Sequence, residues 1–483
     1  MKSNKCRYSI IGKKLGKFLK TEYFIVALVA GIAFCFYCWI FTEIPLTQSP
    51  DGPYYLIQVK SLIENVCLKH EDPPLAMVLF ALSNVLLGDA TLGIELAVAF
   101  FSAISAVPFY FWVKSSIRDK YGAFAAMLLF IFLGHHTRLI TIFYKNAVGI
   151  FFLVFFLYYF TKMGMEGTTL KNTLFASLFL ILTGATHILD FAVALLFVIM
   201  YATISLLMNL NRRNFLKGSA ISLFIAGQLC VFAFMLSPDL SSDIQRLPTT
   251  ISYFLQNDQF FFYSPLFSVR ARSFFLNMTV ISIMIAGLSL ALFYLRHSRK
   301  SPQVLQVFSV AIVGLILSVP FIPYQFLDRF FLMQFITISF VLGYVFSKLR
   351  NMNLIKLLLL FLLLFAGWAL VLQSTMFDKM GPWVCRPVTE EIKKLELAKS
   401  IIPQNSVIIV PDSLRGLRYW TEYVTECGTV MAVSPNLWQI YQHVLMMYPR
   451  GPLPFEISQQ STRLFEDESF VLLEVKSWYA VKD

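Results

Sequence analysis

The sequence predicts an α-helical membrane protein of about eleven transmembrane helices with a small C-terminal α/β domain. Three observations predict it: the apolar composition, the long apolar stretches and the one-sided distribution of positive charge. The 483 residues are 57% hydrophobic and only 14% charged, they include 49 Phe, and the mean hydropathy is +0.68. A soluble fold of this length could not bury so much apolar surface, whereas lipid solvates it.

Eleven apolar stretches are predicted to cross the membrane, the shorter ones extending into their flanks, because about 20 apolar residues span the hydrocarbon core. They are Tyr23–Phe41, Leu92–Val113, Tyr121–Gly134, Ala147–Phe160, Thr173–Thr186, Phe191–Met208, Gly218–Ser237, Met278–Leu295, Val304–Phe321, Phe330–Ser347 and Leu357–Leu372. An odd number of spans places the N-terminus and the C-terminal domain on opposite sides.

Positive charge assigns the sides. The connectors rich in Lys and Arg are Lys114/Arg118/Lys120, Lys162/Lys171, Arg212/Arg213/Lys217, Arg296/Arg299/Lys300 and Lys348/Arg350/Lys356. Such connectors mark the cytoplasmic face. The net charge of +12 is explained in this way, so we do not expect nucleic-acid binding.

The stretch Pro73–Gly88 is apolar but has only 16 residues and opens with two prolines. Counting it as a span would invert every later connector, so an interfacial or re-entrant helix is predicted. Before it, Tyr54–Cys67 has apolar residues at helical spacing, which predicts an amphipathic helix on the membrane surface.

The domain prediction follows. Residues 1–373 form the membrane module, with outer loops at 42–91 and 238–277, and residues 374–483 form the soluble domain. In that domain Val388–Ile402 is expected to be a helix, and Ser406–Val410 and Phe470–Val475 are expected to be strands.

Ionisable residues gather at the predicted outer ends of the spans, whereas the span interiors hold almost none. Asp51, in SPDGPYYL, lies between Pro50, Gly52 and Pro53, which would stiffen the loop. It is interpreted as a general base or a metal ligand; a turn-forming Asp is the alternative. Glu71 or His70 is the candidate second catalytic or substrate-binding group. Asp72 could bind substrate or cap the next helix.

Histidines add to the outer set. His187 and Asp190 lie three residues apart and could hold a metal or a sugar, or the Asp could simply orient the His. His135 and His136 are weaker candidates, since adjacent side chains diverge on a helix.

Outer cations could bind a phosphate or interact with lipid headgroups. They are Arg138, Lys145, Arg270, Arg272 and Arg329. Arg329 is the preferred phosphate ligand, because Asp328 precedes it and could orient it.

This order of motifs resembles the GT-C superfamily of polytopic glycosyltransferases, which includes protein O-mannosyltransferases and aminoarabinose transferases. The likeness lies in Asp51 in the first outer loop, the Pro73-Pro74-Leu75 element, the basic turn Arg118–Gly122 and the late pair Asp328 and Arg329. It implies a sugar donor on a polyprenyl phosphate, with Asp51 as the base that deprotonates an acceptor hydroxyl.

The resemblance also implies an active site on the outer face of a prokaryotic plasma membrane or on the lumenal face of the endoplasmic reticulum. The acceptor stays open between lipid, glycan and protein, and a Mg²⁺ or Mn²⁺ cofactor stays open as well. Two other classes remain as alternatives: a lipid or polysaccharide transporter, and a non-catalytic membrane scaffold. A transporter predicts inverted repeats and polar residues at the bilayer midplane, and the sequence shows neither.

Overall fold

The computed structural model describes residues 22–42, 51–207, 302–317, 324–348, 389–431, 433–451 and 455–477, and the single positions 47, 49, 227 and 287. The chain divides into two compact units. The first contains Met1–Glu43, His70–Phe80 and Glu95–Ser374; the second contains Ile44–Lys69, Ala81–Ile94 and Thr375–Asp483. The segment Ile44–Lys69, predicted as part of an outer loop, therefore groups with the C-terminal residues.

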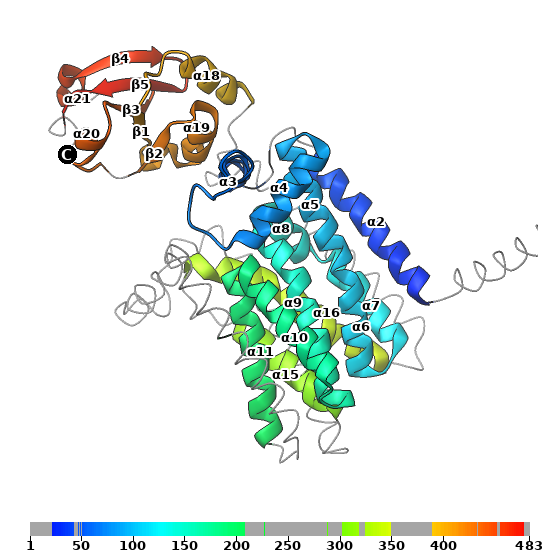
Figure 1. Cartoon of the computed structure of the whole chain (residues 1–483). Coiled ribbons are helices and arrows are strands. Elements are labelled where there is room, and N and C mark those ends of the chain that lie inside the picture. Colours follow the sequence, from blue (N-terminus) through cyan, green and yellow to red (C-terminus); the bar gives the residue numbers. More distant parts are fainter. Residues whose placement is uncertain are drawn as a thin grey trace, which may run out of the picture. The chain divides into compact units, whose positions relative to one another are not determined.

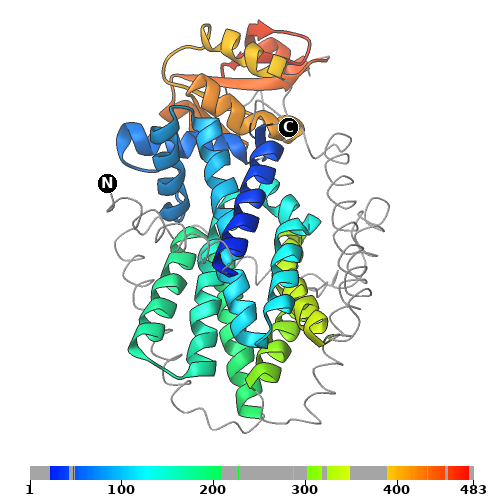
Figure 2. The same ribbon diagram turned by 90° about the vertical axis from the view of Figure 1, so that its right-hand side faces the viewer.

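The described residues of the first unit are mostly helical, and these helices pack side by side (Figures 1 and 2). They are α2 (Glu22–Thr42), α6 (Ala106–Ile117), α7 (Lys120–Phe132), α8 (Gly134–Ile142), α9 (Tyr144–Glu166), α10 (Leu170–Thr186), α11 (Ile188–Leu207), α15 (Pro302–Leu317) and α16 (Tyr324–Lys348). Two helices have residues in both units: α4 (Pro74–Leu87) and α5 (Ala90–Ile104).

Four helical segments in the described part of the chain are long and apolar enough to cross a membrane, or five if the bent pair α7 and α8 is one span. They are Glu22–Thr42, Ala90–Ile117, Tyr144–Glu166 and Ile188–Leu207, and further apolar helices are shorter. An apolar, mostly helical membrane protein is thus confirmed, whereas the number eleven stays a prediction. The predicted spans Gly218–Ser237, Met278–Leu295 and Leu357–Leu372 lie outside the described residues, apart from positions 227 and 287.

The connector predicted after Gly134 is helical in the structure, and its outer position stays a prediction. Residues Gly134–Ile142 form α8, which continues from α7 with a bend of 43°. Seven of its nine residues are buried, including His135 and His136. A helix satisfies its own backbone hydrogen bonds, so this polar sequence can enter the packed interior.

The predicted non-spanning helix exists as α4, of 14 residues. Its side chains Leu82, Val85 and Leu86 are 56%, 67% and 75% exposed. Helix α4 is therefore shorter than the candidate spans and has an exposed apolar face, while its interfacial position stays a prediction.

Helices α7 and α16 approach each other through small residues. A Cβ added to Gly343 of α16 would lie 2.6 Å from Cβ of Ala126 and 2.7 Å from the carbonyl oxygen of Gly122, both on α7. Close backbone approach at Gly and Ala is typical of membrane helix pairs, whose association relies on van der Waals contact. This contact fixes α16, whose first turns carry Arg329.

Replacing Gly343 by Ala is therefore expected to destabilise the protein by about 1–3 kcal/mol, as overpacking does in a filled core. Unfolding in detergent micelles would measure the change. Gly31→Ala on α2 is the matched control, since nothing lies within 4 Å of its added Cβ. Equal stability of both variants would show that α7 and α16 can separate at no cost.

The second unit contains α3 (Gly52–Asn65) and the C-terminal α/β domain. The domain has a five-stranded sheet in the order β2-β1-β3-β5-β4, in which β1 pairs in parallel with β2 and β3 and the other pairs are antiparallel. Its strands are β1 (Ser406–Ile409), β2 (Gly428–Val430), β3 (His443–Pro449), β4 (Ser461–Glu466) and β5 (Phe470–Val475). Its helices are α18 (Thr389–Lys399), the 3₁₀ helix η2 (Asp412–Leu417), α19 (Arg418–Thr425), α20 (Leu437–Ile440) and α21 (Phe455–Gln460).

The predicted small sheet domain is confirmed, and its core explains why it folds. The alternate residues Val407 and Ile409 of β1, Val471 of β5 and Leu437 of α20 belong to one buried apolar cluster. The other side chains of β1 and β5 are also largely buried, so helices are needed on both faces of the sheet (Figure 1).

Candidate functional site

The first turn of α9 binds three carboxylates. Tyr144 donates its hydroxyl to Glu95 at 3.0 Å, Lys145 pairs with Asp72 at 2.5 Å, and the Asn146 amide donates to Asp190 at 3.1 Å. The three acids come from different elements, namely α5, the segment before α4 and α11. All six residues belong to the first unit, so the first turn of α9 connects α5, α11 and the segment before α4 within that unit.

The helical conformation is interrupted between α8 and α9 at Phe143, whose φ of −120° and ψ of 75° are not helical. This break makes Tyr144, Lys145 and Asn146 the first residues of a 23-residue helix. The first N–H groups of a helix have no partner within it, and the helix dipole is positive at this end. The start of α9 therefore favours an anion.

Arg329 adds a second cation here. Its guanidinium lies 4.7 Å from the ring centre of Phe143, which immediately precedes α9. Asp190 accepts from Asn146, the residue after Lys145, and lies 3.4 Å from His187 Nδ1, so these side chains gather around the start of α9. Arg329, the preferred phosphate ligand in the sequence analysis, therefore lies over an aromatic ring. The planar guanidinium suits this arrangement.

His187 and Asp190 flank the junction of α10 and α11. His187 is the extended C-cap of α10, and Asp190 lies in the first turn of α11. The His187 Nδ1 and Asp190 Oδ2 atoms are 3.4 Å apart, a contact whose geometry does not make a hydrogen bond. Asp190 is fully buried against Gly149, where an added Cβ would lie 2.0 Å from Oδ2. Gly149 is therefore needed to admit the carboxylate.

The histidines of α8 are packed rather than open. His136 stacks on Phe335 with ring centres 4.3 Å apart, and its Nδ1 lies 2.9 Å from the Phe130 carbonyl and 3.1 Å from the Tyr37 hydroxyl. His135 is buried as well. These contacts assign His136 to the helix core, while a substrate role for this pair stays a prediction.

Asp51 lies in the second unit, directly before α3. Its backbone is fixed, because its own N–H donates to Ser49 Oγ at 3.2 Å and that of Gly52 donates to the Ser49 carbonyl at 2.9 Å. Gly52 is buried so closely that an added Cβ would lie 1.8 Å from Thr47 Oγ1. The Asp51 side chain does not cap α3. Among the described residues, Ser49 and Thr47 therefore surround the start of α3 closely.

Of the remaining candidates, Glu71 is exposed and His70 is half-buried. Asp328 lies in α16, and Arg270 and Arg272 lie outside the described residues. The first unit therefore brings together five of the predicted residues. These are Asp72, Lys145, His187, Asp190 and Arg329, which contact one another or the residues 143–146.

Sequence reasoning missed Glu95, Tyr144 and Asn146. Glu95 is 3% exposed in a helix that the sequence assigned to the membrane, and an acid inside a span is itself a functional signal. Asn146 directly follows the candidate Lys145 and directly precedes the predicted span Ala147–Phe160, and this position next to a candidate is the signal that could have found it.

A divalent cation is not supported by the described residues, among which no three His, Cys, Asp or Glu side chains converge as metal ligands. In the first unit Asp72, Asp190 and Glu95 are each bound by a different residue of α9. No chemical step is therefore assigned to a metal.

No protein-family model and no curated protein matches the sequence. Solved structures do match in fold. ArnT from Cupriavidus metallidurans bound to undecaprenyl phosphate has 13% identity and a TM-score of 0.59, over 94% of this chain and 98% of that one. The oligosaccharyltransferase AglB from Archaeoglobus fulgidus, in complex with an inhibitory peptide and a dolichol-phosphate, has 12% identity and a TM-score of 0.57, over 84% of this chain.

This chain spans 64% of the length of AglB. Both proteins are GT-C membrane glycosyltransferases, so the resemblance predicted from the motifs is confirmed at the level of fold.

Proposed function

We propose that this protein is a membrane glycosyltransferase that takes a sugar from a polyprenyl-phosphate donor and transfers it to an acceptor hydroxyl. The observation that carries the proposal is the pair of cations, Lys145 and Arg329, near the N-terminus of α9. A helix N-terminus with two cations is suited to a phosphate. The fold adds support, since the two neighbours described above contain a polyprenyl phosphate or a dolichol-phosphate.

In the proposed reaction the acceptor oxygen attacks the anomeric carbon while its proton moves to the Asp51 carboxylate. The bond between that carbon and the phosphate oxygen breaks, and the electron pair leaves with the phosphate. Arg329 and Lys145 would stabilise the charge on the departing lipid phosphate. A single displacement of this kind inverts the anomeric carbon.

Asp72 would have a supporting role. Its carboxylate holds the Lys145 ammonium at 2.5 Å, and the Asp72 side chain is only 4% exposed. Glu71, the other acid of this segment, is exposed. We therefore keep Asp51 as the proposed base, with Glu71 as the candidate next in line.

The donor site is tested at Arg329. Arg329→Ala is expected to weaken the binding of undecaprenyl phosphate by about tenfold or more, and Arg329→Lys to weaken it less, because an ammonium lacks the two-pronged contact. Binding would be measured on the full chain in lipid nanodiscs by native mass spectrometry.

Lys348→Ala is the matched control. Lys348 is at the other end of the same helix, and its ammonium also lies over an aromatic ring, 5.3 Å from the centre of Tyr344. Undecaprenyl phosphate affinity should be unchanged in this control. Equal affinities for wild type and both Arg329 variants would return Arg329 to a purely structural role and remove the proposed donor site.

A further inference from the structure

Helix α3, which starts directly after Asp51, belongs to the same compact unit as the C-terminal α/β domain and packs on its helix α19. Lys60 of α3 and Glu426 at the end of α19 are 366 residues apart in sequence. Near the start of α3, the ring of Tyr54 lies edge-to-face on that of Tyr419, with centres 5.4 Å apart. The contact therefore begins within the first turn of α3, three residues after Asp51.

A buried acid holds the segment that follows α3. The side chain of Glu422 on α19 is 1% exposed, and its Oε1 lies 2.9 Å from the Lys69 ammonium. Its Oε2 accepts a hydrogen bond from Thr429 at 2.8 Å. A buried carboxylate depends on such partners, so the pair with Lys69 is a strong constraint on the chain leaving α3.

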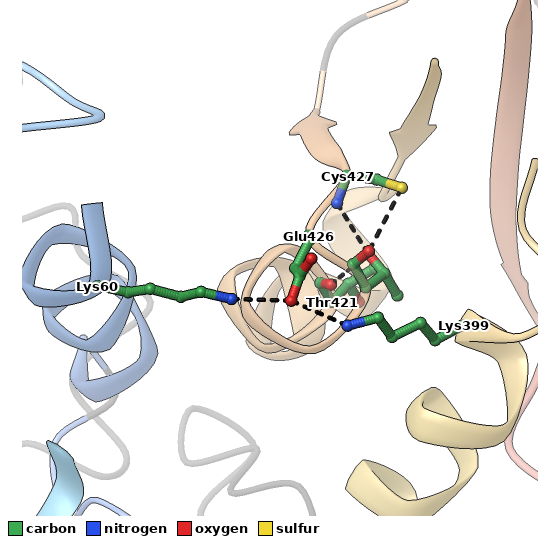
Figure 3. Close-up of polar contacts among 6 residues, drawn as sticks. Lys60, Lys399, Thr421, Glu426 and Cys427 are labelled. Carbon is green, nitrogen blue, oxygen red and sulfur yellow. Dashed lines mark hydrogen bonds and ion pairs between the residues drawn. The ribbon is translucent and has the colours of Figure 1, made fainter. Parts of the chain in front are cut away.

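A second acid, Glu426, joins three elements at the end of α19. It accepts from Lys60 of α3 at 2.8 Å and from Lys399 of α18 at 2.9 Å, as Figure 3 shows. Glu426 is the C-cap of α19 with a φ of +64°, a conformation that favours glycine. Its backbone is thus strained for a side chain, and what the glutamate contributes there is its two ion pairs.

These contacts are spread along the whole of α3. Tyr54 lies in its first turn, Lys60 lies past its middle, and Lys69 follows its end. Fourteen helical residues cover about 21 Å, so the helix is held at both ends and cannot pivot about a single contact. The direction of α3, and with it the place of Asp51, is thereby tied to the α/β domain.

We propose that the C-terminal α/β domain positions Asp51 for catalysis, with Glu422 and Glu426 of α19 acting as positioning residues through Lys69 and Lys60 of the α3 segment. This inference rests on the proposed function of Asp51. It gives the soluble domain, in which the sequence shows nothing catalytic, a defined part in turnover. In this proposal Glu422 and Glu426 act through their ion pairs with the α3 segment and not on the substrate.

The test compares two lysines that bind the same carboxylate. Lys60→Glu and Lys399→Glu each place a negative charge opposite Glu426, but only Lys60 belongs to α3. Lys60→Glu should speed amide hydrogen exchange in α3 by about tenfold, since a surface ion pair becomes a repulsion. Lys399→Glu should leave α3 exchange near that of the wild type. Both variants are studied as the full chain in nanodiscs.

Turnover is measured as the rate at which polyprenyl phosphate is released. Each variant is added to membranes from the source cells after the gene for this protein has been deleted. This product is the same whichever sugar is transferred. Lys60→Glu should lower the release rate at least about threefold, because misplacing a reacting group by 1 Å can cost up to about 100-fold. The affinity of Lys60→Glu for undecaprenyl phosphate should be unchanged. Lys60→Arg keeps a cation opposite Glu426 and should release polyprenyl phosphate at the wild-type rate. General misfolding would instead lower rate and affinity together.

A second variant guards against loss of folding. Glu426→Gly removes both ion pairs but relieves the left-handed backbone, so the α/β domain should keep its stability while α3 exchange rises.

The pH dependence of amide exchange in α3 gives an independent test. Hydrogen bonds from Lys60 and then Lys399 lower the pKa of Glu426 from 4.5 to about 2. A lowered folded-state pKa means that this contribution is present above pH 4.5 and is lost as the pH falls toward 2. The contact would then be constant between pH 5 and 8. Amide exchange in α3 should be slower in wild type than in Glu426→Gly above pH 4.5. This difference should disappear as the pH falls toward 2, and amide exchange of both proteins measured at the same pH would test it.

The outcomes separate the two proposals. Unchanged α3 exchange in Lys60→Glu, or equal changes in Lys60→Glu and Lys399→Glu, would overturn the coupling. Faster α3 exchange with full release, in a protein that Asp51→Asn inactivates, would overturn the positioning role and leave the proposed function standing. Full release by Asp51→Asn would remove Asp51 as the base, and the positioning role would fall with it.

Discussion

Asp51→Asn is expected to lower turnover by about 10²–10⁴-fold, the usual contribution of a general base. Asn keeps the size and turn preference of Asp but lacks the basic oxygen. The side chain does not cap α3, so the substitution should leave the helix and the expression of the protein intact. Undecaprenyl phosphate affinity should change little, because the proposed phosphate ligands are other residues.

Two further variants sharpen this result. Asp51→Glu should recover little activity, since a longer side chain on a backbone fixed by Ser49 misplaces the carboxylate. Asp89→Asn is the matched control, an Asp of the same compact unit whose Oδ1 accepts from the Leu92 N–H at 2.8 Å, a contact that Asn preserves. Polyprenyl phosphate release would be measured for all three. Near wild-type release by the Asp51→Asn variant would point to Glu71 as the next candidate.

Most of the local structure could be predicted from the sequence, because apolar length and turn residues act locally. Strand β5 has the predicted bounds, and α4 and α3 agree with the predicted helices within a few residues. The sequence could not show that α8 is a buried helix. Its polar residues His135, His136 and Arg138 match a loop equally well, and only tertiary contacts such as the stacking of His136 on Phe335 decide between the two.

The sequence analysis named several residues of the candidate site but not the contacts between them. The sequence singled out Lys145, Asp72, Asp190 and Arg329 as separate outer residues, and a single sequence contains no information on which of them pair. The pairing depends on the break at Phe143, which makes Lys145 the second residue of α9 and turns it toward Asp72. The link between α3 and α19 is equally invisible, since it joins lysines and glutamates hundreds of residues apart.

The pair of Asp72 and Lys145 is expected to have the largest effect on stability. Its side chains are 4% and 15% exposed, so removing one partner leaves a buried charge without its counterion. Breaking a buried ion pair in this way costs about 3–5 kcal/mol. Asp72→Asn and Lys145→Gln should therefore each destabilise the first unit strongly, as measured by unfolding in mixed micelles.

The double variant Asp72→Asn/Lys145→Gln should recover much of that loss, because a neutral amide pair carries no buried charge. The coupling free energy from the double-mutant cycle isolates the ion pair from other contacts of the two residues. Additive losses, with no recovery in the double variant, would show that the pair contributes little and that each residue acts through other neighbours.

The same three variants separate stability from donor binding. Asp72→Asn removes the carboxylate that pairs with Lys145, so undecaprenyl phosphate should bind at least as tightly as to wild type. Lys145→Gln removes one of the two proposed ligands and should weaken binding by about tenfold, as loss of a charged hydrogen bond does. The single variants would then lose stability alike and diverge in affinity. The double variant would be stable yet bind weakly, a combination that a purely structural ion pair could not produce.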